Sequence, residues 1–269
     1  MKIKSYAKIN YNLKIVEKAS NGYHKLESIM SLIDFYDDIV FEESEKIEVY
    51  TKPFVCKEEE NLCYKVACYL KKFSKEKKGI KIVINKRIPV GGGLGGGSSN
   101  AAVTMLYLNC YWKLNFNRKK LMNIAFGFGA DIPFFLYKRQ SRVSGFGEKI
   151  RKISKPIIKN IILIVPPFSL STKDVFRVFV FGELNDKRGI VGESYNDLEK
   201  SANMISGNKI EEIKTVVNGI GKGYSLMSGS GSSVVYYVDD ELEDVVEVYN
   251  KIKLLLPECK IYLSKMKSN

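Results

Sequence analysis

A run of six glycines, interrupted only by Leu94, constrains the fold of this chain more than any other feature. The run spans Gly91–Gly97, follows a β-branched stretch at Ile80–Ile84, and leads through a Ser-Ser-Asn sequence into an alanine-rich helical pattern. Glycines let the backbone approach a ligand closely, and a loop that opens a helix directs free N–H groups and the positive end of the helix dipole at one point. The sequence therefore predicts a strand, loop and helix unit that binds an anion.

This loop differs from the common nucleotide-binding loops. The dinucleotide pattern GxGxxG is met trivially, but no acidic residue follows about 20 positions later to hold a ribose. The Walker A lysine is missing from Gly96-Gly97-Ser98, and the chain has neither an HRD nor a DFG motif. A flexible linker seldom leads from a strand directly into such a helix, so a phosphate cradle of backbone N–H groups and serine hydroxyls is favoured. Its candidate residues are Pro89, Val90, Gly91, Gly92, Gly93, Leu94, Gly95, Gly96, Gly97, Ser98 and Ser99.

The net charge indicates an anionic ligand. The 269 residues include 43 Lys and Arg and 30 Asp and Glu, a formal charge of +13. Nine of these positive charges lie in residues 77–130, which contain no Asp or Glu, so only +4 remains for the other 215 residues. This distribution predicts a field that concentrates polyphosphate at the loop, although single lysines can simply be solvated. A nucleic-acid-binding surface would carry interleaved aromatic residues, and only Phe73 occurs between Lys71 and Arg87.

The composition is that of a globular protein. Apolar residues make up 45% of the chain, which excludes intrinsic disorder, and no apolar run approaches the roughly 18 to 20 residues that cross a bilayer. The first residues lack the pattern of a secretory signal, so a soluble, unexported, cytoplasmic protein is expected, without a membrane partner. The five cysteines form no CxxC pair, and the prediction is neither a disulfide framework nor a zinc site, with the thiols reduced and mostly packed.

The periodicity of apolar residues predicts an α+β protein. Alternation at Lys2–Val16 and near Leu32–Phe41 indicates two antiparallel strands, and Glu58–Phe73 has helical spacing with Asn61 as a plausible N-cap. A composition change near residue 155 suggests a division into residues 1–155 and 156–269. Further strands are expected at Ile161–Val165, after Ser228–Ser232 and at Lys260–Leu263, and further helices at Tyr195–Ala202, Ile210–Val217 and Leu242–Leu255.

Several collinear motifs resemble those of the galactokinase, homoserine, mevalonate and phosphomevalonate (GHMP) kinase superfamily. Within it, the resemblance is strongest to kinases of a cytidine diphosphate-linked tetrol, 4-diphosphocytidyl-2-C-methyl-D-erythritol, and it covers nearly the whole chain. AKIN and GYH are far more specific for this group than the glycine loop. Besides the loop, the motifs are AKIN (Ala7–Asn10), GYH (Gly22–His24), ENL (Glu60–Leu62), GADIPF (Gly129–Phe134), GxGE (Gly145–Glu148), NDLE (Asn196–Glu199) and SGSGS (Ser228–Ser232).

The resemblance implies a two-domain GHMP kinase fold. The N-terminal domain would be like ribosomal protein S5 domain 2 and bind ATP, the C-terminal domain would be α/β-plait-like, and the active site would lie in the cleft between them. It also implies transfer of a phosphoryl group from ATP, with Mg²⁺, to the 2-hydroxyl of the tetrol, in the methylerythritol phosphate route to isoprenoid precursors. The expected partner is this small molecule, with no nucleic acid, and the expected assembly is a monomer or weak homodimer.

Two residues are candidates for catalysis. Asp131 is the first carboxylate after the acid-free stretch and is the natural general base, which is also its role by resemblance; its alternative role is a helix N-cap. Lys8 is a cation in an apolar strand pattern, and by resemblance it is the partner of Asp131; alone, it would be an exposed strand residue. Ser98, Ser99 and Asp131 offer oxygens near a magnesium ion, but no metal ligand is assigned.

Four residues are candidates for substrate binding. Asn10 lies on the same strand face as Lys8 and can bond the substrate hydroxyl or Lys8. His24, the only histidine, and Tyr23 can hydrogen-bond and stack on a nucleobase, which by resemblance is cytosine. Phe176 is the candidate for a second stacking ring. The alternatives are a structural histidine and a core phenylalanine.

Two other functions are open at this point. Another GHMP kinase, acting on homoserine or mevalonate, would have no use for the GYH pair, because those substrates carry no base. A non-catalytic nucleic-acid-binding protein would use the net charge and be indifferent to Asp131→Asn. One departure from the family pattern is Phe146, where a basic residue is common inside GxGE, so a phosphate contact from that position is in doubt.

Overall fold

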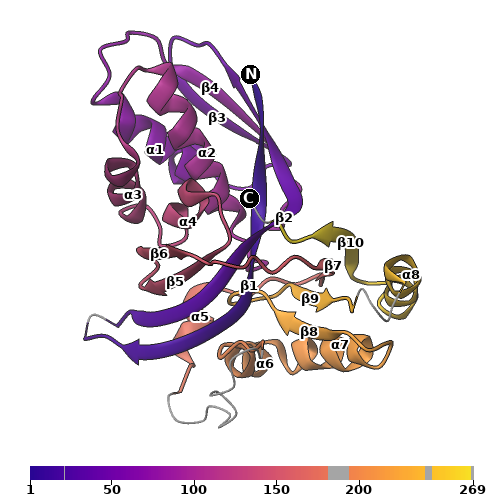
Figure 1. Cartoon of the computed structure of the whole chain (residues 1–269). Helices are drawn as coiled ribbons and strands as arrows, with labels where there is room; N and C mark the ends of the chain where they lie inside the picture. The colour runs from indigo at the N-terminus through magenta and orange to yellow at the C-terminus, as the bar shows by residue number, and fades with distance from the viewer. Residues whose placement is uncertain (21, 181–193, 240–243, 268–269) are drawn as a thin grey trace.

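A long antiparallel hairpin runs through both halves of the molecule. In the computed structural model, which describes residues 1–20, 22–180, 194–239 and 244–267, β1 (Lys2–Lys18) pairs with β2 (His24–Glu42). Figure 1 shows the two strands extending from the upper sheet into the lower half. The predicted antiparallel start is confirmed, and β2 begins at His24 rather than near Leu32.

The first half is a sheet covered by helices on one side. Its strand order over the described residues is β3-β4-β2-β5-β6, with β1 beside β2. Strands β3 and β4 are parallel, as their crossover through α1 allows. Helices α1 to α4 pack against the sheet (Figure 1). The elements are β3 (Ile47–Lys52), a 3-10 turn (Glu58–Glu60), α1 (Leu62–Lys71), β4 (Ile80–Asn85), α2 (Gly96–Tyr111), α3 (Arg118–Phe126), α4 (Ile132–Tyr137), β5 (Ser141–Gly145) and β6 (Lys149–Lys152).

The second half is a smaller antiparallel sheet. Its order over the described residues is β10-β7-β9-β8, with α6 and α7 below it and α8 beside β10 in Figure 1. The elements are β7 (Asn160–Val165), α5 (Thr172–Arg177), α6 (Glu199–Ser206), α7 (Lys209–Asn218), β8 (Tyr224–Met227), β9 (Val234–Tyr237), α8 (Val245–Leu255) and β10 (Lys260–Lys265).

A shared apolar core joins the two sheets. Ala7 and Ile9 of β1 are fully buried in one cluster with Ile161 and Leu163 of β7 and Tyr237 of β9. Burial of this apolar surface stabilises the contact at roughly 25 cal/mol per Å² removed from water. The β1–β2 hairpin therefore fixes the glycine loop of the first half relative to the second.

Helix boundaries follow capping more closely than periodicity. The Asn61 side chain accepts a hydrogen bond from the Cys63 N–H at 2.9 Å, so its predicted N-cap role is confirmed. The expected helix at Tyr195–Ala202 begins too early, because the Asn196 side chain donates to the Met227 and Gly229 carbonyls and α6 starts at Glu199. Residues 242 and 243 of the expected helix at 242–255 lie outside the described residues, and α8 starts at Val245.

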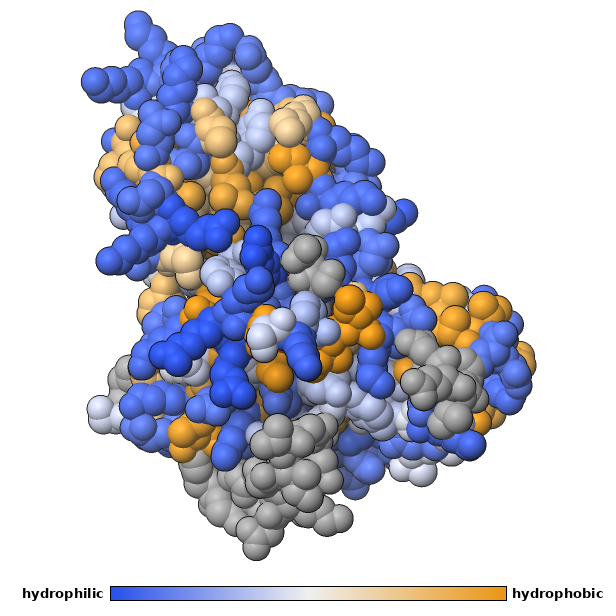
Figure 2. Space-filling view, viewed as in Figure 1, coloured by the Kyte–Doolittle hydropathy of each residue, from blue (hydrophilic) through white to orange (hydrophobic). Residues whose placement is uncertain are grey.

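The surface in the view of Figure 2 is mainly hydrophilic, with separate apolar groups over α8 and over the helices of the first half. On α8 the exposed apolar residues include Val246, Leu254 and Leu255. Within the part of the chain that the structure describes, no helix has both the length and the apolar character needed to cross a membrane. The prediction that the thiols are reduced and mostly packed is confirmed, because all five cysteines are free and only Cys110 among them is exposed.

Candidate active site

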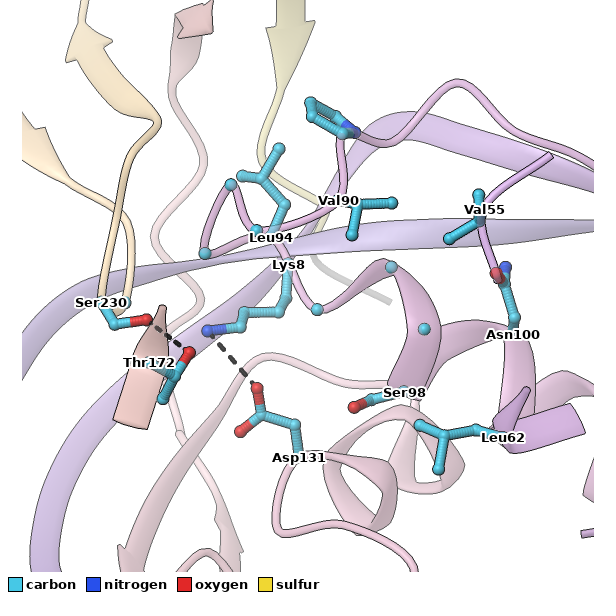
Figure 3. Close-up of a pocket in the computed structure, with 18 of the residues that line it drawn as sticks. Lys8, Val55, Leu62, Val90, Leu94, Ser98, Asn100, Asp131, Thr172 and Ser230 are labelled. Atoms are coloured by element: carbon cyan, nitrogen blue, oxygen red, sulfur yellow. Dashed lines mark hydrogen bonds and ion pairs between the residues drawn. The ribbon is translucent and has the colours of Figure 1, made fainter. Parts of the chain in front are cut away.

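A cavity of about 430 Å³ lies beside the glycine loop, between the two halves of the molecule. Figure 3 shows the side chains converging on it from β1, the loop, α2 and α4 on one side and α5 and the Ser228–Ser232 turn on the other. Of the predicted residues, those lining it are Lys8, Asn10, Pro89, Val90, Gly91, Gly92, Gly93, Leu94, Gly95, Gly96, Gly97, Ser98, Asp131 and Phe176.

The glycine loop is held against the turn at Ser228–Ser232. The Ser232 N–H donates to the Gly91 carbonyl at 3.3 Å, and the Ser228 hydroxyl donates to the Gly93 carbonyl at 3.2 Å. Gly93 has a φ of +73°, and a Cβ there would lie 2.0 Å from the Ser228 carbonyl oxygen. This position accepts only glycine. The Ser228–Ser232 turn therefore supports the loop, while its Gly229 and Ser230 line the cavity.

The loop opens directly into α2, which presents its N-terminus to the cavity. The first amides of a helix have no intrahelical carbonyl, so those of Gly96, Gly97 and Ser98 are available to an anion. Ser99 is different, because its N–H donates to the Gly95 carbonyl and its hydroxyl donates to the Tyr6 carbonyl. The residue is buried, with 2% exposed. Its predicted direct contact with the cofactor is not what the structure shows, because helical rotation turns its side chain into the packing with β1.

Lys8 and Asp131 meet at the wall of the cavity. The Lys8 Nζ lies 3.6 Å from Asp131 Oδ2 and donates to Asn10 Oδ1 at 2.7 Å. The Asn10 amide in turn donates to the Ser28 hydroxyl at 2.7 Å, which fixes the orientation of the amide. Lys8 is buried, with 5% of its side chain exposed, whereas 33% of the Asp131 side chain is exposed. The strand arrangement predicted for Lys8 and Asn10 is confirmed, and Lys8 is not the exposed strand residue of the alternative.

Asp131 occupies the N-cap position of α4 without acting as a cap. Its side chain makes no capping hydrogen bond. Pro133, in the first turn of α4, has no backbone N–H that a cap could bind. The carboxylate is therefore free of a helix-capping role and faces Lys8 and the cavity (Figure 3). A buried ammonium beside a half-exposed carboxylate favours negative charge at this point of the wall.

The predicted base-binding residues are only partly brought together. The centroid of the His24 ring lies 5.2 Å from that of Phe176, which lines the cavity. His24 is 9% exposed. Tyr23, in contrast, is 69% exposed and forms an edge-to-face pair with Phe146, with 6.4 Å between the ring centroids. The structure does not bring Tyr23 to the cavity, because Tyr23 precedes β2 and its ring packs on Phe146, whereas the His24 ring packs on Phe176.

The imidazole of His24 gives the fold a pH dependence. Burial, and to a smaller extent the positive charge of Lys18, lower the pKa of His24 below its usual value of 6.5. The unfolded chain then binds more protons than the folded chain, so the free energy of unfolding is expected to fall as the pH drops below about 6.5. Urea unfolding between pH 7.5 and 5 should show this loss and a smaller loss for His24→Asn. Because the chain has one histidine, NMR reads its pKa directly; a value at or above 6.5 would contradict the account.

Sequence reasoning found Val90 but missed two other apolar residues of the cavity. Val55, which follows β3, and Leu62, which opens α1, line it together with Val90 at the entry of the glycine loop. The ENL motif was the available signal, because it marks the start of α1, but the approach of Val55 depends on the pairing of β3 with β4, which the periodicity did not predict.

The cations of residues 77–130 are only partly directed at the cavity. Of the nine cations in residues 77–130, Lys86 lines the cavity. Lys78, Lys81 and Lys113 instead form ion pairs with surface glutamates, namely Glu43, Glu42 and Glu76, at 2.8 to 2.9 Å. The acid-free stretch is thus partly neutralised by acids from elsewhere in the fold. The groups beside the cavity that can attract an anion are the N-terminus of α2, Lys8 and Lys86.

Comparisons with known proteins agree with this geometry. Residues 61–139 match the GHMP kinases N terminal domain. A 4-diphosphocytidyl-2-C-methyl-D-erythritol kinase of Thermodesulfovibrio yellowstonii is 37% identical over 86% of this chain and 87% of its own, and one of Clostridium botulinum strain Alaska E43 is 36% identical over 94% and 96%. A crystal structure of 4-(cytidine 5'-diphospho)-2C-methyl-D-erythritol kinase superposes with a TM-score of 0.83 at 25% identity, covering all of both chains.

The fold and the site define a GHMP-type kinase with the two-domain GHMP fold. The defining features are the strand, glycine loop and helix unit, the lysine–aspartate pair beside it, and the two sheets that share a core. The chain is an ATP-dependent small-molecule kinase. At these identities and coverages it belongs to the 4-diphosphocytidyl-2-C-methyl-D-erythritol kinase family.

Proposed function

We propose that this chain transfers the γ-phosphoryl group of ATP to the 2-hydroxyl of 4-diphosphocytidyl-2-C-methyl-D-erythritol, a step in the methylerythritol phosphate pathway to isoprenoid precursors. The observation that carries the proposal is the Lys8–Asp131 pair at 3.6 Å, in the wall of a cavity that also holds the N-terminus of α2. Family membership supports the acceptor, since the relatives named above are kinases of this compound.

In the proposed reaction, Asp131 receives the proton of the attacking hydroxyl. The oxygen then forms a bond to the γ-phosphorus while the bond to the β-phosphate oxygen breaks, releasing ADP. Lys8 stabilises negative charge on the transferring group, and Asn10 keeps its ammonium in place through the 2.7 Å hydrogen bond. Half exposure of Asp131 lets a substrate hydroxyl reach it, while burial of Lys8 strengthens its field.

We propose that the triphosphate binds along the glycine loop, with its terminal groups at the amides of Gly96, Gly97 and Ser98. The apolar side chains of Val55, Leu62 and Val90 in the lining of the cavity suit the adenine ring. We expect the cytosine to bind at Phe176, which lines the cavity, and at His24 next to it. The distance of 5.2 Å between the two ring centroids supports a common aromatic site. The contacts of Tyr23 with the base and of Ser99 with ATP stay predictions.

We also propose Mg²⁺ as the cofactor that accompanies ATP. The described part of the chain holds no cluster of three His, Cys, Asp or Glu side chains. The carboxylate of Asp131 and the hydroxyl of Ser98 in the cavity wall suit an ion that takes most of its ligands from phosphate oxygens. When bound, such an ion neutralises charge on the β- and γ-phosphates.

The remaining expectations stand as proposals. The strands of the first sheet end at Lys152 and those of the second begin at Asn160, which supports a division into domains near residue 155. Small, charged, water-soluble substrates suit an enzyme of the cytoplasm that acts as a monomer or weak homodimer. Neither a nucleic acid nor a membrane is required for the proposed reaction.

A panel of acceptors tests the function. ADP release should be measured with diphosphocytidyl-methylerythritol, homoserine and mevalonate in parallel, each with Mg²⁺ and ATP. We expect turnover with the cytidine compound and rates at the ATP-hydrolysis background with the other two, because neither offers a base for the His24–Phe176 site. Folded protein that binds ATP but shows no turnover of the cytidine compound would disprove the proposed acceptor. Binding to unrelated oligonucleotides, lost steeply with salt, would support the nucleic-acid alternative.

A further inference from the structure

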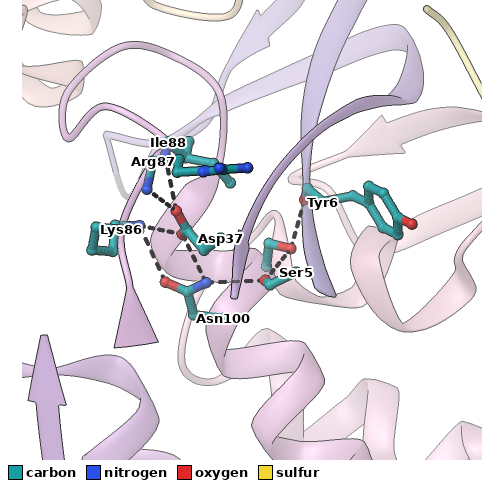
Figure 4. A network of polar contacts seen from close by, with 8 residues as sticks. Ser5, Tyr6, Asp37, Lys86, Arg87, Ile88 and Asn100 are labelled. Carbon is teal, nitrogen blue, oxygen red and sulfur yellow. Dashed lines mark hydrogen bonds and ion pairs between the residues drawn. The ribbon is translucent and has the colours of Figure 1, made fainter. Parts of the chain in front are cut away.

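A buried carboxylate from β2 holds the backbone that enters the glycine loop. Asp37 is 0% exposed, and its Oδ1 accepts hydrogen bonds from the backbone N–H groups of Arg87 at 2.7 Å and Ile88 at 2.8 Å. Figure 4 shows these two bonds beside the start of the loop. Hydrogen bonds to an ionised group are roughly twice as strong as neutral ones. The entry to the loop is thus fixed to the central strand pair.

The second oxygen of Asp37 reaches the helix that leaves the loop. Asp37 Oδ2 lies 2.5 Å from Lys86 Nζ and accepts from the Asn100 side-chain amide at 3.0 Å. Asn100, in α2, also accepts from Lys86 at 3.2 Å and donates to the Ser5 hydroxyl at 3.0 Å. One carboxylate therefore connects the residues before the loop with the helix after it (Figure 4).

The backbone that enters the loop and the first turn of α2 are packed closely against each other. A Cβ added at Gly96 would lie 2.8 Å from Ile88 Cγ2 and 3.1 Å from Lys86 Nζ. The Lys86 side chain is 9% exposed and lines the cavity, whereas Asp37 does not line it. Without the carboxylate, the buried ammonium would lose its counter-charge, and a buried unpaired charge forces rearrangement. The first amides of α2 would move with it.

We propose that Asp37 is a positioning residue for ATP: it sets the spacing between the loop entry and the α2 N-terminus without contacting the nucleotide. The proposal rests on the proposed function only in taking ATP as the ligand of the loop. Because misplacement of a binding group by about 1 Å can cost up to 10²-fold, Asp37→Asn should raise both the dissociation constant and the KM for ATP about 10- to 100-fold. The KM for the cytidine substrate should stay within about threefold, since His24 and Phe176 lie elsewhere.

Asp38→Asn is the matched control. It makes the same chemical change at the next residue of β2, on the opposite face of the strand, where Asp38 pairs with Lys2 at 3.0 Å. ATP affinity should be measured by calorimetry without acceptor, KM values by ADP release, and stability by thermal unfolding. Asn100→Ala serves as a second, milder variant. Asn100 lines the cavity, but its side-chain amide donates to Ser5 and Asp37, so the variant acts through this network. It removes the link to α2 and leaves the bonds to Arg87 and Ile88 intact.

A selective loss of ATP affinity in Asp37→Asn, absent in Asp38→Asn, supports the proposal. A lowered melting temperature with unchanged ATP affinity would show a merely structural role, and equal losses for both substrates would overturn the proposal as well. If Asp37→Asn does not fold, Asn100→Ala decides: weakened ATP binding supports the positioning role and unchanged binding refutes it. Since calorimetry needs no acceptor, a failure of the proposed acceptor leaves this test intact.

Discussion

Asp131→Asn is expected to lower kcat about 10²- to 10⁴-fold, the range that a positioned general base contributes. The amide has the shape of the carboxylate but cannot take the proton of the attacking hydroxyl. Asp131 makes no helix-capping bond, and Lys8 keeps its 2.7 Å bond to Asn10, so the fold and the site should persist. ADP release at saturating substrates measures kcat, and calorimetry measures ATP affinity, which should be unchanged or slightly tighter because a negative charge is removed.

The comparison with Asp38→Asn separates catalysis from general loss of charge. That control removes a carboxylate outside the cavity and should change kcat by less than about twofold, in keeping with the small contribution of surface ion pairs. An Asp131→Asn enzyme that keeps kcat near the wild-type value would remove Asp131 from its proposed role as base, although the kinase assignment would stand.

Gly93→Ala is expected to abolish measurable ATP binding and to destabilise the protein. The methyl group would lie 2.0 Å from the Ser228 carbonyl oxygen, and alanine at a φ of +73° adds strain of about 1–2 kcal/mol. The loop can relieve the clash only by leaving the Ser228–Ser232 turn, which breaks its hydrogen bonds and shifts the amides at the start of α2. Calorimetric titration with ATP and urea unfolding measure the two effects.

Gly207→Ala is the control that isolates strain from collision. Gly207, after α6, has a φ of +65°, and a Cβ there would meet nothing within 4 Å. Gly207→Ala should therefore lower the free energy of unfolding only by the backbone strain of about 1–2 kcal/mol, and its activity should stay normal. Equal destabilisation in both variants, with ATP binding retained in Gly93→Ala, would show that the loop does not depend on its contact with the turn.

Local chemistry made much of the fold and site predictable. Alternation in β1 placed Lys8 and Asn10 on one face, and a single side chain defined the N-cap at Asn61, because both features depend on neighbours within a few residues. Asp131 stood out as the first acid after a long gap. Its approach to Lys8 came from resemblance, since spacing along the chain cannot give the distance between two distant residues.

Long-range pairing was the part that sequence could not supply. Lys78 and Lys113 looked like charges for the ligand until the fold placed Glu43 and Glu76 beside them. Asp37 looked like any acid in a strand, and only the approach of Lys86 and Asn100 gives it a role. Ser99 was assigned to the phosphate cradle and Tyr23 to base stacking beside His24. The rotation of α2 directs the Ser99 side chain into the packing with β1, and Tyr23 packs on Phe146 outside the cavity.

The identity of the product tests the central proposal most directly. After incubation of the wild-type protein with Mg²⁺, ATP and diphosphocytidyl-methylerythritol, ³¹P and ¹³C NMR should show a new phosphomonoester coupled to carbon 2 of the tetrol, formed in equal amount with ADP. Phosphate on another hydroxyl would contradict the proposed orientation of the substrate toward Asp131. ADP accompanied only by inorganic phosphate would contradict transfer to this acceptor.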